Sequence, residues 1–336
     1  VLGIKNGDIN DQSTVGDSNA FISKFNSFGD TLWTKLIGSS EFDEGTAIDI
    51  SDDNSVYILG NTAGNMDGVE NKGDYDIFLS KYNSNGEEKW TEFIATNSSD
   101  IAGDIVVTKD NSILITGSAG GDPFIGKYDF FGNNILTEFL GGNRNKIPRF
   151  LTLASDDSIY VSGATNGDVF LTKLNNDLQQ IWTKEIGTTK NDYVKDIILD
   201  NQENIYIAGT TDGIFDGNLS SDGWDGYISK ISPEGLKIWT KQMPGHEIYS
   251  LSKANDGDLF IAGSIIGDYT ENELGIKFTQ GNSEWPYEHD RNGFIAKIST
   301  TGTELYRYYF GNQGQGEEPM SLTSDNDSNI YMAGYV

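Results

Sequence analysis

The chain has 336 residues, with 51 Asp and Glu against 23 Lys and Arg, and its formal net charge is −28. Such an acidic chain repels phosphate backbones and anionic lipid surfaces, so we expect neither nucleic-acid binding nor membrane binding. It contains no cysteine, which excludes disulfides and thiolate metal sites. No apolar stretch approaches the ~18 to 20 residues of a membrane helix, so we expect no membrane insertion.

A short strand ending in glycine recurs seven times along the chain. Its copies lie at 1–3, 56–60, 113–117, 159–163, 205–209, 259–263 and 330–334. They return at intervals of roughly 50 residues, which is a period typical of propellers. The repetition runs from end to end and therefore predicts one domain over 1–336.

Each period carries three further segments. An apolar run such as 47–50 precedes the glycine-ended strand and reads as a strand buried on both faces. An alternating strand such as DIFLSKY follows it, and then a fourth strand such as KWTEFI. Short turns rich in Gly, Asn and Asp separate these segments, as four-stranded antiparallel blades require. The sequence therefore predicts an all-β propeller of four-stranded antiparallel blades.

The number of strands of each kind favours six blades. One blade would combine 319–336 with 1–38, which would remove the open edges of the stack. The other blades are predicted at about 45–95, 103–141, 149–187, 194–243 and 247–311. A seven-bladed ring would follow instead if the sequence is an excerpt that lacks strands beyond both ends. Because the chain starts in mid-strand, we expect it to be part of a larger polypeptide or assembly.

Several recurring residues suggest structural roles rather than functional ones. A lysine follows the third strand in every unit, and six copies of one site indicate a repeated packing role. The acidic turns between the first two strands need no metal, because Asp and Asn bond the backbone and tolerate left-handed conformations. The strand-ending glycines are predicted where a backbone approaches closely or φ is positive. The lysines are Lys24, Lys81, Lys127, Lys173, Lys230 and Lys297.

The repeats at 56–94 and 205–241 resemble the bacterial SBBP-type beta-propeller repeat family. The resemblance covers nearly the whole chain. Proteins of that family are large, secreted or surface-associated, and often cyanobacterial, so the resemblance implies an extracellular or cell-surface location. It implies a propeller and carries no activity with it, because propellers support many unrelated functions.

The loops between the second and third strands are expected to share one face of the molecule with the connections between blades. Two of these loops align without a gap and place carboxylates around glycines and an aromatic residue. Clustered carboxylates suit calcium, and the alternative is a loop held by side-chain hydrogen bonds to its own backbone. The candidate calcium ligands are Asp67, Asp74, Asp76, Asp216, Asp222 and Asp225.

The same face is the expected place for a ligand. The longest insertion, at about 264–292, stands beside units with very short loops, and its exposed aromatic residues could stack on sugar rings or dock a protein. The alternative is an insertion packed over a blade edge. The ligand-binding candidates are Tyr75, Trp224, Trp285, Tyr287, His289 and Arg291.

The sequence gives little support for catalysis. His246 and His289 are its only histidines, and they lie in different blades. No nucleophile elbow, phosphate-binding glycine loop or flavin fingerprint is present. We therefore expect a non-catalytic binding or structural module, with a glycan or a surface protein as partner and no cofactor beyond calcium. The alternative is a polysaccharide hydrolase or lyase that uses carboxylates near the propeller axis.

Overall fold

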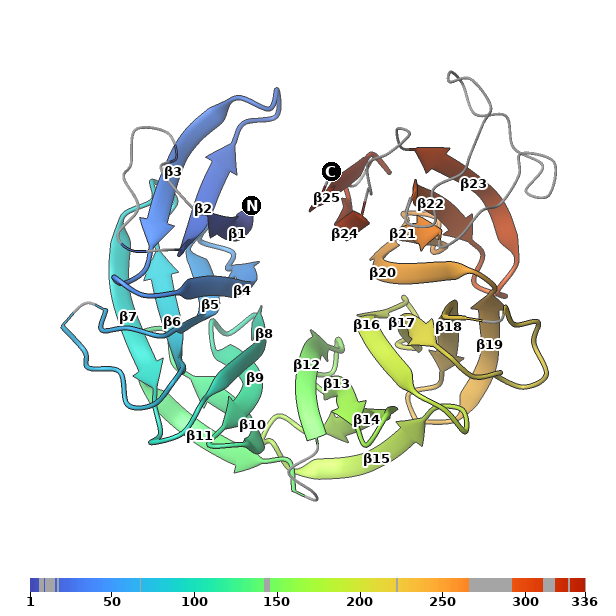
Figure 1. The fold of residues 1–336 in the computed structure, drawn as a ribbon, viewed down its shortest axis with the longest axis horizontal. Coiled ribbons are helices and arrows are strands. Elements are labelled where there is room, and N and C mark those ends of the chain that lie inside the picture. The colour runs from blue at the N-terminus through green and yellow to red at the C-terminus, as the bar shows by residue number, and fades with distance from the viewer. Residues whose placement is uncertain are drawn as a thin grey trace. The chain divides into compact units, whose positions relative to one another are not determined.

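A computed structural model shows an all-β chain, and the predicted fold class is confirmed (Figure 1). The structure describes residues 1–5, 9, 16, 18–66, 68–141, 146–221, 223–265, 292–310, 318–325 and 327–335. The chain divides into two compact units. One contains Val1–Thr165 and Thr172–Ile181, and the other contains Asn166–Leu171 and Trp182–Val336.

The strands form antiparallel sheets in chain order. A three-stranded sheet contains β1 (Leu2–Lys5), β2 (Asn19–Phe25) and β3 (Thr31–Ile37). The next sheet contains β4 (Asp43–Ile50), β5 (Val56–Thr62), β6 (Asp76–Tyr82) and β7 (Glu88–Ile94). It is followed by β8 (Ile101–Val107), β9 (Ile113–Ala119), β10 (Asp122–Tyr128) and β11 (Asn134–Phe139).

The remaining sheets repeat this order. They contain β12 (Lys146–Leu153), β13 (Ile159–Thr165), β14 (Asp168–Leu174) and β15 (Gln180–Ile186), then β16 (Asp192–Leu199), β17 (Ile205–Thr211), β18 (Asp225–Ile231) and β19 (Lys237–Met243). The last four-stranded sheet is β20 (His246–Lys253), β21 (Leu259–Ile265), β22 (Asn292–Ile298) and β23 (Glu304–Phe310), and β24 (Glu318–Ser324) pairs with β25 (Ile330–Tyr335). Each four-stranded sheet matches one predicted blade.

The two ends of the chain lie in separate sheets. β1 pairs with β2 through Leu2 and Ile22. It therefore occupies the edge of β2 at which the strand at 330–334 would pair in the predicted blade that combines both ends of the chain. β24 pairs with β25 in a two-stranded sheet. Joining of the ends, the number of blades and the single domain therefore stay predictions.

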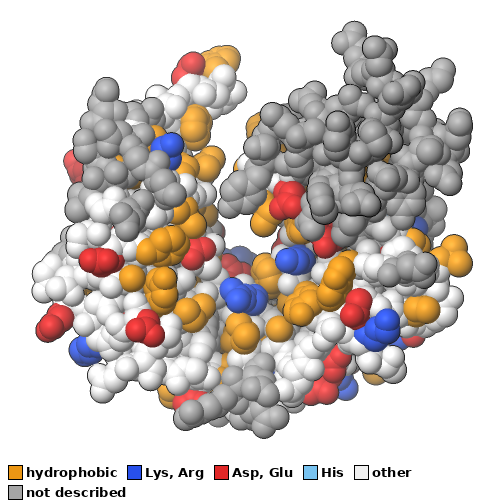
Figure 2. Space-filling view, viewed as in Figure 1, with side chains coloured by type: hydrophobic (Ala, Val, Ile, Leu, Met, Phe, Trp, Pro, Cys, Tyr) orange, Lys and Arg blue, Asp and Glu red, His pale blue; other side chains and the backbone are white. Residues whose placement is uncertain are grey.

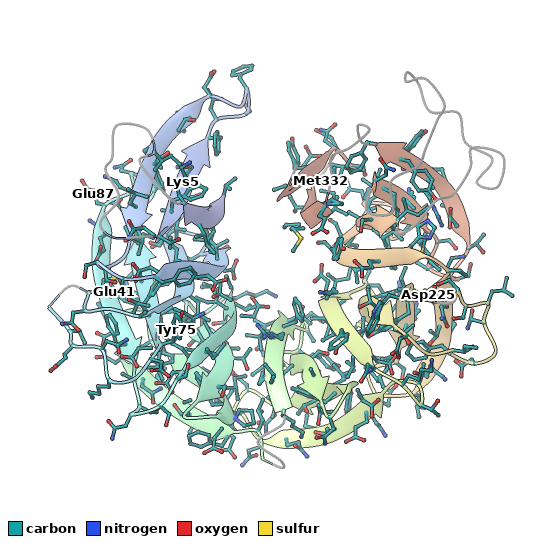
Figure 3. All side chains as sticks on the ribbon, in the orientation of Figure 1. Lys5, Glu41, Tyr75, Glu87, Asp225 and Met332 are labelled. Atoms are coloured by element: carbon teal, nitrogen blue, oxygen red, sulfur yellow. The ribbon has the colours of Figure 1, made fainter. Side chains whose placement is uncertain are left out.

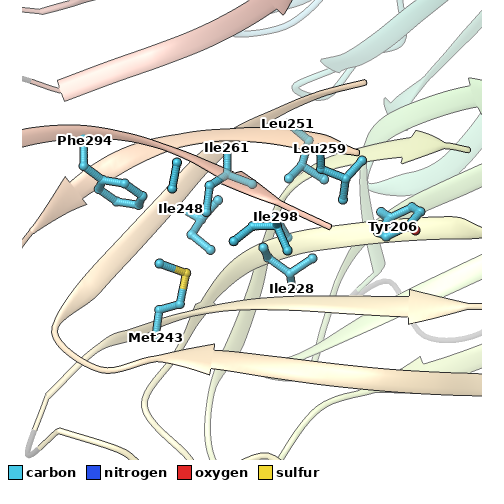
Figure 4. Close-up of a cluster of buried hydrophobic side chains, with 11 residues drawn as sticks. Tyr206, Ile228, Met243, Ile248, Leu251, Leu259, Ile261, Phe294 and Ile298 are labelled. Atoms are coloured by element: carbon cyan, nitrogen blue, oxygen red, sulfur yellow. The ribbon is translucent and has the colours of Figure 1, made fainter. Parts of the chain in front are cut away.

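Apolar side chains between neighbouring sheets form the core of each unit. In the second unit, Ile228 and Met243 of one blade meet Ile248 and Phe294 of the next (Figure 4). Tyr57 and Leu79 meet Ile105 and Phe124 in the same way in the first unit. Phe124 of β10 and Phe294 of β22, which lie at equivalent points of their strands, are thus interblade core residues.

The strand-ending glycines are needed because the neighbouring backbone comes very close. A Cβ on Gly60 or Gly117 would overlap the carbonyl oxygen of Glu44 or Ile101 in the adjacent first strand, and Gly209 faces Tyr193 in the same way. None of these glycines has a positive φ. The predicted close approach is confirmed, and positive φ is not the reason for these glycines.

The repeated lysine and the fourth-strand tryptophan connect each blade to the next. Lys24 Nζ and Trp33 Nε1 both donate to the carbonyl of Ser84, at 3.0 and 3.2 Å. Lys230 Nζ and Trp239 Nε1 both donate to Thr300 O at 3.3 Å. These bonds join a blade to a turn of its neighbour, so the predicted structural role of the lysines is confirmed here.

The acidic turns between first and second strands also behave as predicted. Asn54, Asn111 and Asp157 have φ values of 61°, 62° and 62°, in the left-handed region that Asn and Asp tolerate. Asp53 Oδ1 accepts the backbone N–H of Ser55 at 2.9 Å. These carboxylates serve the turn itself.

Candidate functional site

Buried aspartates at the start of the strands hold the loops on one face of each unit. Asp192 Oδ2 accepts the N–H of Thr188 at 2.6 Å, and Asp225 Oδ2 accepts the N–H of Ser221 at 3.0 Å. Both aspartates are 0 % exposed. Because each carboxylate binds the backbone four residues earlier, it fixes the connection that leads into its strand.

Asp225 is the most extensively bonded of these anchors. It also accepts the N–H of Gly245 at 2.8 Å and the amide of Gln242 at 2.8 Å. Burial would raise the pKa of Asp225, but the hydrogen bonds from Ser221, Gly245 and Gln242 outweigh burial and lower it. This carboxylate is therefore ionised and committed to the loops around it (Figure 3).

These anchors position an aromatic pair in the second unit. Trp224 precedes Asp225 and Tyr193 follows Asp192, and their rings pack with centroids 5.4 Å apart and planes at 41°. Tyr193 is 43 % exposed, so one ring of the pair presents a large face to solvent. The side chains of Ile214 and Leu219, 58 % and 81 % exposed, lie in the loop that carries Trp224.

A related pair occurs in the first unit. Tyr75 (Figure 3) precedes the anchor Asp76. Phe42 precedes the anchor Asp43 in the same way. Their ring centroids are 6.2 Å apart with an interplanar angle of 88°. The two long loops that align in sequence thus each place an aromatic residue against the start of a first strand. Tyr193 and Phe42 were missed by sequence reasoning, because they precede or open strands that read only as core.

Four ligand candidates, Trp285, Tyr287, His289 and Arg291, lie outside the described residues, as do Asp67 and Asp222 of the calcium candidates. The calcium candidates that the structure describes do not share one set of contacts. Asp76 accepts the N–H of Lys72 at 2.8 Å, and Asp216 forms an ion pair with Lys237 at 2.7 Å.

No group of three or more His, Asp or Glu side chains is placed to hold a metal ion within the part of the chain that the structure describes. The calcium assignment therefore stays a prediction. In Figure 2, acidic and apolar side chains are interspersed on the viewed face.

Carboxylates on the first strands, which a propeller places next to its axis, accept hydrogen bonds from the backbone of the neighbouring blade. Asp49 Oδ2 accepts the N–H of Val107 at 2.7 Å, and Asp104 Oδ2 accepts that of Leu151 at 2.8 Å. Asp196 Oδ2 accepts the N–H of Leu251 at 2.7 Å, and burial raises the pKa of Asp196 to about 6. These three carboxylates therefore join neighbouring first strands.

His246 is buried in a polar network that sequence reasoning also missed. Its Nε2 accepts from Arg307 Nη1 at 2.5 Å and from Tyr309 Oη at 2.9 Å, so its proton lies on Nδ1 and is donated to Pro244 O at 2.7 Å. Glu304 binds the same guanidinium at 2.6 and 3.0 Å. Burial, and then the charge of Arg307, lower the pKa of His246 to about 4. Both ring nitrogens are occupied, which leaves none to accept a substrate proton.

A cavity of about 200 Å³ lies in the second unit between β15 and β19, lined by Lys184, Gly187, Phe215 and Lys237. The ion pair between Lys237 and Asp216 lies at its edge. This space is small for a ligand site, since such sites usually occupy ≈ 300–1,000 Å³. The aromatic pair is the better candidate.

The sheet order and the repeated strands define a β-propeller. Residues 181–216 match the SBBP family, described as a beta-propeller repeat. The chain therefore carries an SBBP-type repeat, as the sequence predicted. No curated protein matches the chain significantly. No helix among the described residues is long and apolar enough to span a membrane.

Solved structures resemble the chain at low sequence identity. A 6-phosphogluconolactonase candidate from Bacteroides uniformis has a TM-score of 0.57 and 11 % identity, over 99 % of this chain and 88 % of that one. A protein from Lactobacillus plantarum has a TM-score of 0.55 and 8 % identity, over 99 % and 94 %. A protein of unknown function from Bacteroides caccae has a TM-score of 0.51 and 11 % identity, over 92 % and 93 %. At these identities the likeness concerns the fold alone.

Proposed function

We propose that the chain is a non-catalytic binding module of a secreted or cell-surface bacterial protein. In this proposal a glycan binds on the loop face of the second unit, against the pair formed by Tyr193 and Trp224. The observation that carries the proposal is this packed pair, with ring centroids 5.4 Å apart, Tyr193 43 % exposed, and the buried Asp192 and Asp225 next to the two rings in sequence. A rigid aromatic face can stack on a sugar ring at little entropic cost.

Two observations favour binding over catalysis. The first-strand carboxylates Asp49, Asp104 and Asp196 already accept backbone N–H groups of the next blade. Both nitrogens of His246 are occupied by Pro244, Arg307 and Tyr309. Groups committed in this way are poorly suited to general acid or base chemistry, which needs a free position facing the substrate. Calcium in the acidic loops forms part of the proposal as a stabilising ion.

The proposal is tested by screening the protein against immobilised glycans, with hydrolysis of the same glycans measured in parallel. We expect binding without turnover, and loss of at least tenfold in affinity for Trp224→Ala and Tyr193→Ala. Tyr308→Ala is the matched control, because Tyr308 is 65 % exposed on the outer strand β23. Turnover of a bound polysaccharide would support the hydrolase or lyase alternative, and binding only to a protein would replace the glycan as ligand.

A further inference from the structure

A junction between neighbouring blades recurs in both units. It joins the start of the third strand of one blade to the start of the first strand of the next blade. In the first unit, the N–H of Asp43 donates to Ser18 O at 2.9 Å. Asn19 Nδ2 donates to Asp43 Oδ2 at 3.2 Å, and the N–H of Ser39 donates to the same oxygen at 2.6 Å. The amide of Asn19 thus supplies a donor to a buried carboxylate.

The second unit builds the same junction from Asp168 and Asp192. The N–H of Asp192 donates to Gly167 O at 2.6 Å, as Asp43 does to Ser18. The N–H of Thr188 donates to Asp192 Oδ2 at 2.6 Å, as Ser39 does to Asp43. The backbone frame is therefore the same, while a second carboxylate replaces the asparagine.

A glycine at the equivalent place shows which atoms correspond. A Cβ added to Gly38 would meet Asn19 Nδ2 and Asp43 Oδ2. A Cβ added to Gly187 would lie 2.8 Å from Asp168 Oδ1 and 2.8 Å from Asp192 Oδ2. Asp168 Oδ1 therefore occupies the position of the donating Asn19 Nδ2, beside Asp192 Oδ2, which also accepts the N–H and the hydroxyl of Thr188.

No described lysine, arginine or histidine neutralises this pair. Neither Asp168 nor Asp192 forms an ion pair with a described residue, and Asp192 Oδ1 is buried without a hydrogen-bond partner. The titratable groups that act on Asp192 are Asp168 from β14 and the buried hydroxyl of Tyr227 from β18. Two adjacent carboxylates in such surroundings cannot both ionise without a large penalty.

We propose that Asp168 and Asp192 share one proton at neutral pH, held between Asp168 Oδ1 and Asp192 Oδ2. The proton comes from solvent, which reaches the partly exposed Asp168 side chain, and it returns there when the pair ionises fully. The junction is therefore a proton-dependent contact between β14 and β16. It takes the place of the amide–carboxylate contact between Asn19 and Asp43.

The electrostatics agree with this assignment. Burial raises the pKa of Asp192 and outweighs the hydrogen bonds from Thr188 and Thr211 that lower it, and the charge of Asp168 adds to the rise. In a coupled pair the proton belongs to both groups. Since the folded pair holds its proton to higher pH than the unfolded chain does, its stabilising effect is complete in acid. The effect is lost as pH rises above the usual carboxyl range.

The test compares thermal unfolding of wild type, Asp168→Asn and Asp192→Asn from pH 5 to pH 8, in EDTA and in calcium. Asp168→Asn recreates the Asn19–Asp43 junction, so we expect a melting temperature at least equal to that of wild type at pH 8 and a flatter pH dependence. Asp192→Asn should lower the melting temperature at every pH, because Thr188 then loses part of its acceptor. Asn19→Asp is the reciprocal variant and should lose more stability at pH 8 than at pH 5.

An infrared measurement gives a readout that does not depend on stability. Wild type at neutral pH should show the C=O band of a protonated carboxylic acid, and Asp168→Asn should lose it. An unchanged spectrum with parallel pH profiles for wild type and Asp168→Asn would overturn the proposal. A calcium-induced rise in melting temperature that Asp168→Asn removes would also overturn it, since the pair would then hold a metal ion in place of the proton.

Discussion

The buried His246 makes the free energy of unfolding depend on pH, and the size of the effect follows from the pKa of this residue. Its pKa falls from 6.5 in the unfolded chain to about 4 in the folded one. The folded protein therefore binds fewer protons than the unfolded chain between these values, and stability falls as pH drops from about 6.5 towards 4. A difference of 2.5 pKa units corresponds to about 3 kcal/mol.

Asp196 acts in the opposite direction over nearly the same range. Its pKa rises from 3.8 to about 6, so its effect on stability is favourable in acid and lost as pH rises. The Asp196 side chain is partly exposed, so solvent screening limits its contribution to about 1–2 kcal/mol. Wild type should then lose about 1–2 kcal/mol between pH 6.5 and pH 4 on the balance of these two groups.

Urea unfolding at pH 4, 5, 6 and 7 measures both effects. His246→Gln should remove the loss in acid, so its stability should fall less than that of wild type as pH drops. Asp196→Asn should leave the histidine effect unopposed and steepen the loss. Identical pH slopes for His246→Gln and wild type would refute the reasoning, because His246 would then titrate normally.

Further predictions concern the repeated contacts and calcium. Gly209→Val should lower the free energy of unfolding by about 1 kcal/mol or more in urea titrations, since the new Cβ would overlap Tyr193 O. Gly223→Val should change it little, because no atom lies within 4 Å of that Cβ. Equal effects of the two substitutions would show that close backbone approach is not the reason for Gly209. Lys230→Met should destabilise the protein by about 3 kcal/mol in the same assay, because it removes the cation that lies 3.1 Å from the buried Asp200 carboxylate. Lys89→Met, at an exposed ion pair, should cost well under 1 kcal/mol. A small loss for Lys230→Met would show that its ion pair is dispensable. Millimolar calcium should raise the melting temperature more than sodium chloride of equal ionic strength, and Asp67→Asn combined with Asp216→Asn should remove most of the difference; matching curves would leave these aspartates as ordinary loop residues.

The blades were predictable because their determinants are local and repeated. The strands carry a period-2 pattern, and most turns carry Gly, Asn or Asp where a left-handed residue is needed. Leu178 shows where a local rule is overridden. It has a φ of 61° in a hairpin turn where the other blades use glycine, such as Gly132. There the surrounding strands hold a leucine in a left-handed conformation that this residue type disfavours.

The site was only half predictable, because its contacts join residues distant in sequence. Trp224 was found from its loop, but its partner Tyr193 lies 31 positions earlier at the start of a strand (224 − 193). The network of His246 and Arg307 spans 61 positions. Patterns in a single sequence show that a residue is aromatic or charged, and the topology then decides which partner it meets.

We propose that a ligand binds at the aromatic pair on the loop face of the second unit. Hydrogen exchange of the full chain, with and without the glycan selected in the screen, tests this most directly. We predict added protection at 191–195, 212–221 and 223–224, and loss of that protection in Trp224→Ala but not in Tyr308→Ala. Protection confined to the opposite turns, such as 232–236, with 191–195 unchanged, would contradict it.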